Sequence, residues 1–418
     1  MTRLTTYGVF SLIVILTGVL LTCSNRNPSK DQRSSKEAKR LAIDKDKAGI
    51  LDFKVLFNPP EFIPLETNPY SLVSDWNQVV ITDSIVFVVP ASNQIPNGVL
   101  MFNRDGSFRS SIFKHGRGPD EYISLPFIYV DELLNQILFY DAMNYTFGWM
   151  DYSGEYIKKI KTPGLAGTNV YVHPKTGKIL LDTSSGGVIK DSIYHPCQLA
   201  ILDPNTNEYK VVREMPYEEN WLTSTGFSTF GDNIYFKSTS WDTIYAIGEE
   251  DMVPKYIFDF GKYSKPKAYY KDGPYEYFKS NNMTGLVLKN WIFKEGEDYI
   301  ISIHGVHSEG RIFHHYDKKT ETSHVYNRFM NDYVGQTDII TFELDKVILP
   351  FYSYKDKLVF IYEPVQLIRN YNRLTMELKP DELEIFKKDN PRFIKLISNL
   401  KETDNPVLAL YSFRRDNK

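Results

Sequence analysis

Short apolar strands recur along this chain at a nearly constant spacing, and this regularity limits its fold more than any other feature. Met101–Phe108 (MFNRDGSF) aligns with Trp149–Tyr156 (WMDYSGEY) at an offset of 48 residues, and the same strand-turn-strand pattern returns at Ile201–Asn207. Apolar runs without a helical period favour β-strands. Asp-Gly and Ser-Gly suit the tight hairpins between them, because Gly tolerates positive φ.

A repeat of about 50 residues with about four strands per unit is typical of a β-propeller. The interval from Asn77 to Tyr362 is 286 residues, which six units of about 48 residues would fill. The 29 Tyr, 26 Phe and 5 Trp also favour strands. We therefore predict an all-β fold, a six-bladed β-propeller over residues 51–418; a pair of large β-sandwiches is the alternative.

The C-terminal part departs from the strand pattern. Pro380, followed by two acidic residues, is typical of a helix start. Apolar residues continue at helical spacing to Leu400. We predict a short helical insertion over about 379–400 and then a closing strand, Val407–Phe413, that helps to join the two ends of the ring.

The N-terminus has the pattern of an export signal. Arg3 precedes the apolar run Val9–Leu21, which is too short to span a bilayer as a helix but fits a signal peptide. The run ends in Leu-Leu-Thr-Cys, which resembles a bacterial lipobox with Cys23 as the lipidated residue. We expect residues 1–22 to be a lipoprotein signal peptide and 23–50 a lipid-anchored flexible tether. An ordinary signal peptide with a chance Cys is the alternative.

A loop in the first third of the chain carries a family resemblance. Gly116–Tyr122 (GRGPDEY), following Phe102–Phe108 (FNRDGSF), resembles the hallmark of six-bladed β-propeller lipoproteins of Bacteroidota, which are NHL-like in architecture. Ile63–Thr67 and Asp404–Leu408 match as well, so the resemblance covers roughly residues 55–413. It implies a propeller at the cell envelope and no established activity.

Composition and motifs argue against several classes of function. A net charge of −3 gives no basic excess for nucleic acid, and two cysteines cannot form a disulfide scaffold. Neither a Gly-x-Ser-x-Gly elbow nor a His-Glu-x-x-His motif is present. Five of the eight histidines fall between His304 and His324, but residues three apart on a strand point to opposite faces. We predict no metal, no cofactor and no catalytic residue.

In a propeller, the connections between the second and third strands of a blade, and those between blades, share one rim around the axis. This placement brings Arg117, Tyr145, Trp241 and His307 to one mouth. Aromatic and polar groups together suit a sugar or a peptide, whereas packing between blades is the other interpretation of Trp241. These four residues are the predicted ligand-binding set.

We therefore expect an envelope-anchored binding or scaffold propeller, held at a membrane by its lipid and accessory to glycan or peptide capture. An envelope protein is a further candidate partner, and the sequence does not choose between the periplasmic and the surface-facing side. The alternative is a propeller enzyme, namely a lyase, lactonase or glycan-cleaving hydrolase. That alternative requires acids, histidines or a metal to converge at the axial mouth, because fold alone does not specify function.

Overall fold

The structure of the protein is a computed structural model. It describes residues 38–91, 98–112, 116, 118, 121–123, 127–183, 187–190, 193–195, 197–214, 226–237, 241–272, 277, 279, 281–341 and 352–414. Cys23, Arg117 and the predicted signal peptide lie outside these residues.

Antiparallel four-stranded sheets are the basic unit of the described residues, and consecutive strands form the first two of them. One sheet contains β4 (Trp76–Ile81), β5 (Ile85–Pro90), β6 (Val99–Asn103) and β7 (Phe108–Ile112). The next contains β8 (Ile128–Asp131), β9 (Gln136–Asp141), β10 (Thr146–Asp151) and β11 (Tyr156–Lys161).

The third sheet contains an inserted hairpin. It pairs β12 (Val170–Val172), β13 (Ile179–Asp182), β16 (Cys197–Leu202) and β17 (Tyr209–Glu214). The hairpin of β14 (Val188–Lys190) and β15 (Ile193–His195) lies between β13 and β16 in the chain.

Two further sheets are extended by strands from the N-terminal segment. One has β18 (Gly226–Phe230), β19 (Asn233–Lys237), β20 (Thr243–Ile247) and β21 (Met252–Asp259), with β1 (Lys39–Ala42) added at its edge. The other has β22 (Val287–Glu295), β23 (Tyr299–Val306), β24 (Gly310–Asp317) and β25 (Thr322–Asn331), with β2 (Gly49–Asp52) and β26 (Gln336–Thr341) both paired to β25.

The last sheet joins the two ends of the described chain. It has the order β27 (Tyr352–Tyr354), β28 (Lys357–Tyr362), β29 (Val407–Ser412) and β3 (Glu61–Pro64). Register pairs run from Val407 opposite Pro64 to Leu410 opposite Glu61. The closing strand that we predicted at 407–413 is thus an internal strand of its sheet, and β3 from the N-terminal side covers it.

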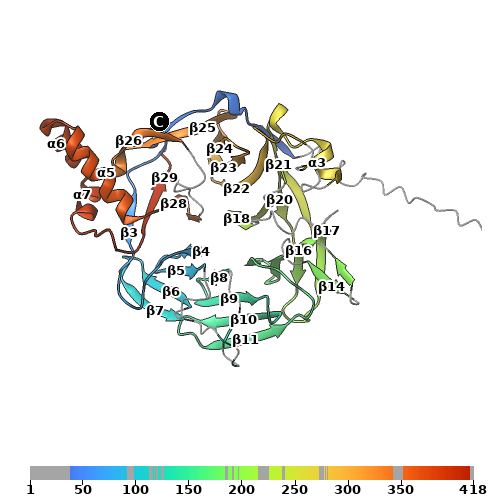
Figure 1. The fold of residues 1–418 in the computed structure, drawn as a ribbon. Coiled ribbons are helices and arrows are strands. Elements are labelled where there is room, and N and C mark those ends of the chain that lie inside the picture. The colour runs from blue at the N-terminus through green and yellow to red at the C-terminus, as the bar shows by residue number, and fades with distance from the viewer. Residues whose placement is uncertain are drawn as a thin grey trace, which may run out of the picture. The chain divides into compact units, whose positions relative to one another are not determined.

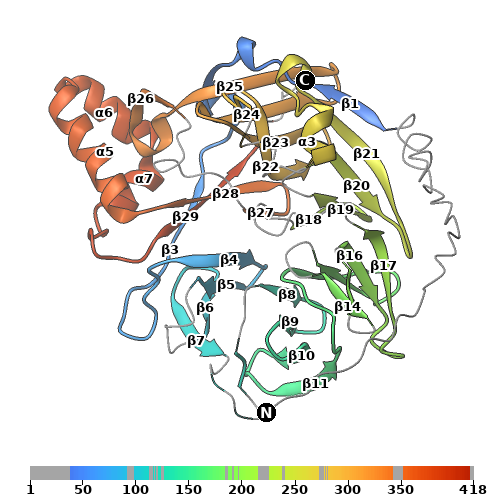
Figure 2. The same cartoon turned by 45° about the vertical axis from the view of Figure 1, so that its right-hand side comes forward.

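The sheets follow one another in a propeller arrangement (Figure 1), and Figure 2 shows the same order in a second view. Neighbouring sheets meet through the first strand of each: β8 contacts β12, β18 contacts β22, and β27 contacts β4. The all-β fold and propeller arrangement predicted from the strand spacing are therefore confirmed. The first strands form the innermost layer.

The repeat predicted from the sequence is visible in the backbone hydrogen bonds of the turns. In the β6–β7 turn, the N–H groups of Asn103 and Gly106 donate to the carbonyls of Ser107 and Asn103. At the offset of 48, the Asp151 and Gly154 N–H groups donate to Glu155 and Asp151 in the same way. Gly106 and Gly154 have φ of 94° and 91°, which explains why both turns carry Gly.

The predicted tether, residues 23–50, extends too far towards the C-terminus, because strands begin at Lys39 and Gly49. Strand β1 pairs in parallel with β21, and β2 begins at Gly49 and pairs in parallel with β25. Leu41 and Ile43 are buried against the β18–β21 sheet. The segment was predicted to be a tether because most of its residues are polar or basic. Burial of its few apolar residues stabilises the added strands.

The helical insertion begins earlier than the predicted 379. It contains α5 (Pro364–Glu377), α6 (Pro380–Asp389) and α7 (Pro391–Ile397), inserted between β28 and β29. Each helix starts with Pro in its first turn, where the missing N–H has no intrahelical partner to lose. The buried residues of α5, among them Leu367, Asn370 and Leu374, recur every three or four residues, so the helical period that the prediction overlooked is present in the sequence.

Shorter helical elements lie in the connections: η1 (Lys45–Lys47), α2 (Phe53–Leu56), η2 (Gly261–Tyr263), α3 (Lys267–Asp272) and η3 (Asp332–Val334).

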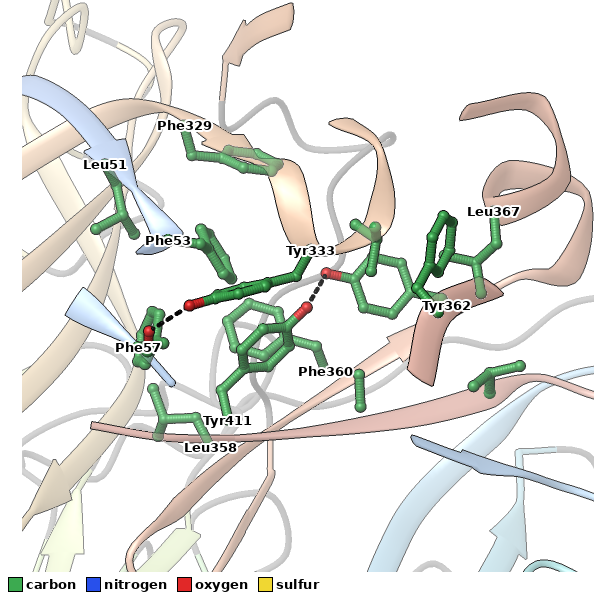
Figure 3. Packing of buried hydrophobic residues seen from close by; sticks show 14 of the residues in the cluster. Leu51, Phe53, Phe57, Phe329, Tyr333, Leu358, Phe360, Tyr362, Leu367 and Tyr411 are labelled. Atoms are coloured by element: carbon green, nitrogen blue, oxygen red, sulfur yellow. Dashed lines mark hydrogen bonds between the residues drawn. The ribbon is translucent and has the colours of Figure 1, made fainter. Parts of the chain in front are cut away.

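A large aromatic cluster fills the space beside the closing sheet (Figure 3). Phe53 and Phe57 of the α2 segment pack against Phe360 and Tyr411, with ring centroids 5.1 to 6.4 Å apart. The Tyr333 hydroxyl donates to the Phe57 carbonyl at 2.9 Å. Burying rings of this size contributes a few kcal/mol each, so the cluster ties the N-terminal segment to the C-terminal strands.

Candidate functional site

A cavity of about 170 Å³ lies at the innermost layer of the propeller. Its lining comes from β12, β18, β19, β22, β27 and β28, and so from sheets that are far apart in sequence. The lining residues are Tyr171, Phe227, Ser228, Thr229, Lys237, Ile292, Phe293, Lys294, Tyr352, Ser353 and Leu358. We refer to this space as the axial cavity.

Aromatic side chains form much of the wall of the axial cavity. The rings of Tyr171 and Phe227 are 5.8 Å apart, and Tyr171 also meets Tyr129 edge-to-face at 4.9 Å. The Tyr352 hydroxyl donates to the Asn77 carbonyl at 3.2 Å, which fixes that ring between β27 and β4. Burial raises the pKa of Tyr171 and Tyr352, so both phenols remain neutral donors at physiological pH.

Two lysines contribute the charge of the axial cavity. Lys294 is only 9% exposed, and its Nζ donates to the Thr229 carbonyl at 3.4 Å. Burial lowers the pKa of Lys294, with Asp356 opposing the shift. Burial also lowers the pKa of Lys237 to about 8, against an opposing effect of Asp182. With a pKa near 8, Lys237 is still mainly protonated at pH 7 and contributes positive charge to the cavity.

The two lysines approach the axial cavity from opposite ends of the sheets. Lys237 is the last residue of β19, opposite Gly226 at the start of β18. Lys294 lies one residue before the end of β22, and the innermost strands β18 and β22 are neighbours.

Tyr145, Trp241 and His307 each lie in the connection between the second and third strands of a sheet. Tyr145 precedes β10 and has φ of 50°, and its carbonyl accepts the Thr162 N–H at 2.8 Å. Trp241 is partly buried in the connection from β19 to β20, while His307 is exposed just after β23. None of these three residues lines the axial cavity, whose lining comes mainly from the innermost strands.

A buried ion pair lies beside Trp241. The Lys265 ammonium, fully buried, donates to Oδ1 of Asp242. Lys265 belongs to the long connection that precedes β22, and it also reaches the Val287 carbonyl at 3.4 Å. Breaking a buried pair by removing one partner costs about 3–5 kcal/mol, so this pair anchors the connection to the β18–β21 sheet.

In its described residues, the Gly116–Tyr122 loop is stabilised by hydrogen bonds within the loop, one of them to the Glu121 carboxylate. The Glu121 carboxylate accepts the Gly118 N–H at 2.7 Å, and the Gly116 N–H donates to the Tyr122 carbonyl at 2.9 Å. A Cβ on Gly116 would overlap the Glu121 carboxylate. These contacts give the loop's glycines a structural role between β7 and β8.

The histidine-rich segment forms a buried chain of hydrogen bonds. Ser302 Oγ lies 2.7 Å from Nε2 of His304 and 2.9 Å from Nδ1 of His314, and His314 Nε2 lies 3.1 Å from Ser323 Oγ. Burial lowers the pKa of His304 well below its ordinary value and that of His314 to about 3. The imidazoles are therefore neutral, satisfied core groups.

Within the described part of the chain, no group of three or more His, Cys, Asp or Glu side chains converges as a metal site would require. The enzyme alternative, which needs such a convergence at the axial mouth, is not favoured. Nor is any helix of the described residues long and apolar enough to cross a membrane.

Lys237, Lys294, Tyr171 and Tyr352 were not predicted from the sequence. One signal could have indicated the lysines. Each directly follows a run of apolar and aromatic residues, Ile-Tyr-Phe-Lys at 234–237 and Trp-Ile-Phe-Lys at 291–294. A lysine that continues a buried strand must lie in a cavity or reach a partner.

Comparison with known proteins gives one family and several similar folds. Residues 40–412 match the family described as a domain of unknown function, DUF4934. No curated protein matches the chain.

Solved structures share the architecture at low sequence identity. A Bacteroides fragilis protein described as exported is 16% identical, with a TM-score of 0.66, over 90% of this chain and 99% of that one. A DUF4221 family member from Bacteroides vulgatus is 11% identical, with a TM-score of 0.47, over 89% and 99%. A virginiamycin B lyase from Staphylococcus aureus is 13% identical, with a TM-score of 0.40, over 64% and 74%. At such identities the first likeness shows the fold alone, and the other two carry no argument.

Proposed function

The chain belongs to the DUF4934 family, and from this premise we propose that it is an exported, envelope-anchored propeller that binds a ligand in the axial cavity. One observation carries the proposal: strands of several sheets, most of them innermost, bring aromatic rings and amino groups together around one cavity. Ligand pockets typically combine apolar walls with a few convergent polar groups. Glycans and peptides, which offer both apolar faces and hydrogen-bonding groups, are the ligand classes that such a wall suits.

We propose that the propeller has six blades. The described strands group into six sheets of at least four strands, and this grouping supports six repeats of the unit predicted from the spacing. Pairing of β29 with β3 supports a rigid site, because it joins the N-terminal and C-terminal parts of the described chain within one sheet.

Export and anchoring belong to the same proposal. A Bacteroides fragilis protein of similar fold is described as exported, and this description and the apolar run before Cys23 both support a location outside the cytoplasm. We propose that Cys23 carries the lipid and that the residues between it and Lys39 form the tether. Stable anchoring needs more than one acyl chain, which a lipidated N-terminal Cys would provide.

A glycan array and a peptide library, probed with the full chain, test the axial site. Tyr352→Ala removes one aromatic wall and should weaken binding at least roughly tenfold. Tyr70→Ala, at a tyrosine 72% exposed, is the matched control and should bind as the unmodified protein does.

The rim set, Arg117, Tyr145, Trp241 and His307, is proposed to contact the part of the ligand outside the cavity. Trp241→Ala should then reduce affinity less than Tyr352→Ala does. A folded Tyr352→Ala variant with unchanged affinity for an identified ligand, combined with lost binding in Trp241→Ala, would move the site from the cavity to the rim.

A further inference from the structure

A second cavity, of about 540 Å³, lies between the β4–β7 sheet and the β8–β11 sheet. These two sheets share one hydrophobic core and lie next to each other in the ring (Figure 2). The walls of the cavity include Arg109, Leu134, Asn135, Gln136, Tyr152 and Ile157. We refer to this space as the inter-sheet cavity. Its volume lies within the range of small-molecule sites.

Three turns border the inter-sheet cavity, namely β4–β5, β8–β9 and β10–β11. Each joins the first and second strands or the third and fourth strands of its sheet. Because successive strands of these sheets are antiparallel, such turns lie at the opposite end of the sheets from the connections that hold Tyr145, Trp241 and His307. The described lining residues of the inter-sheet and axial cavities do not overlap, so the two are separate.

Hydrogen bonds hold the walls of the inter-sheet cavity in place. Asp131 Oδ1 accepts the Leu134 N–H at 3.0 Å and thereby fixes the β8–β9 turn. Glu132 Oε2 accepts the Asp83 N–H at 3.1 Å, which joins a turn of one sheet to a turn of the other. A cavity whose walls are already ordered loses less conformational entropy when a ligand binds.

Several polar side chains of this cavity are available to a ligand. Within the described chain, the Arg109 guanidinium and the amides of Asn135 and Gln136 make no hydrogen bond or ion pair to another residue. Arg109 and Asn135 are exposed. The Tyr152 ring packs edge-to-face against Phe87 at 5.3 Å, which fixes the wall beside them.

Exposed apolar side chains lie beside these polar groups. Leu134 is 63% exposed and Ile157 is 50% exposed, and both line the inter-sheet cavity. A ligand that covers them removes apolar area from water, which is favourable. The cavity therefore suits a ligand that has an apolar face as well as hydrogen-bonding groups.

The charges in and around the inter-sheet cavity balance one another. Arg109 is the one cation and Asp151 the one carboxylate among its described lining residues. Burial, Glu132 and Asp131 raise the pKa of Tyr152 to about 12, and Arg109 opposes the shift. Because acids surround the one cation, the cavity has no excess of positive charge for an anion. Hydroxyl groups, which both donate and accept, match its amide and guanidinium groups.

We propose that the inter-sheet cavity binds a neutral sugar unit of a glycan. A pyranose ring has apolar C–H faces and a rim of hydroxyls. Leu134 and Ile157 cover one face of the ring, while the Arg109 guanidinium and the Gln136 amide bind its hydroxyls. This site does not depend on the axial cavity, and it adds a sugar-binding surface at the other end of the sheets.

Titration of the full chain with maltose, cellobiose and lactose, followed by saturation-transfer difference NMR, tests the inference. At least one of these neutral disaccharides should bind. Arg109→Ala should weaken that binding roughly tenfold, because it removes charge-assisted hydrogen bonds. Leu134→Ser should weaken it roughly threefold or more by removing apolar contact. Leu133→Ser is the matched control, because Leu133 is 95% exposed in the same turn and is not a lining residue.

The possible failures separate this site from the axial one. Tyr352→Ala should leave disaccharide binding at the inter-sheet cavity unchanged. Binding that is lost in Tyr352→Ala but kept in Arg109→Ala and Leu134→Ser would overturn the inter-sheet site and leave the axial site standing. Failure of all three disaccharides to bind would overturn the inter-sheet site alone.

Two further results would also contradict the inference. Equal weakening by Leu133→Ser and Leu134→Ser would show that the apolar contact does not come from the cavity. Tighter binding of D-glucuronate than of D-glucose would show that the ligand is an anion and not a neutral sugar. Thermal melting of each variant verifies that it is folded.

Discussion

Acid should destabilise this protein through its buried histidines, and the size of the effect follows from their surroundings. Burial lowers the pKa of His314 from 6.5 to about 3 and that of His315 to about 4. The unfolded chain therefore binds protons near pH 6.5 that the native protein does not bind until much lower pH. Native stability is fully present above pH 6.5 and is lost as the pH falls below it.

Each of these two histidines should remove about 2 kcal/mol of unfolding free energy between pH 7 and pH 5. Urea unfolding followed by intrinsic fluorescence at the two pH values measures the loss. His314→Gln, whose amide can still reach Ser302 or Ser323, should have a pH dependence smaller by about 2 kcal/mol. His195→Gln, at an exposed position, is the control and should change nothing.

Two results would refute this reasoning. One is an unfolding free energy of the unmodified protein that changes by less than about 1 kcal/mol between pH 7 and pH 5. The other is a His314→Gln variant that keeps the whole pH dependence, since the acid sensitivity would then come from groups other than the buried imidazole.

Four further predictions concern the anchor, the seam, a packed glycine and the axial charge. Cys23→Ser should move the protein from membranes to the soluble fraction, and unchanged detergent partitioning would contradict lipidation. Deleting residues 404–418 removes the strand between β28 and β3, so cooperative melting should be lost; a melting temperature within a few degrees of the full chain would contradict the seam. Gly148→Ala places a methyl group into the Phe139 ring and should cost about 1–3 kcal/mol in urea unfolding, whereas an unchanged midpoint would refute the contact. Native Lys237 loses its proton near pH 8 and the unfolded chain near 10.5, so between pH 8 and pH 10 the unmodified protein should gain unfolding free energy relative to Lys237→Met; an identical pH dependence of the two proteins would contradict this.

The strand repeat was predictable because its turns are local. Asn103–Ser107 and Asp151–Glu155 close through hydrogen bonds between residues at most four apart, so sequence spacing carries their geometry directly. Strand β1 was hidden for the opposite reason. Its partner, β21, lies more than 200 residues away, and only that long-range contact gives Leu41 a core to enter.

The site was harder to predict than the fold. Strand order alone predicts that connections such as the one holding Trp241 lie at a rim. The axial cavity instead depends on which side chains of several innermost strands face one another. Lys237 and Lys294 are 57 residues apart in the sequence and line one cavity only because β18 packs against β22.

The central claim is that the axial cavity is a ligand site. The most direct test is calorimetric titration of the full chain and of its Tyr352→Ala variant with a ligand identified on the glycan array or in the peptide library. The account predicts that Tyr352→Ala, folded as judged by thermal melting, binds that ligand at least roughly tenfold more weakly than the unmodified protein. Equal affinity of the two proteins would contradict it.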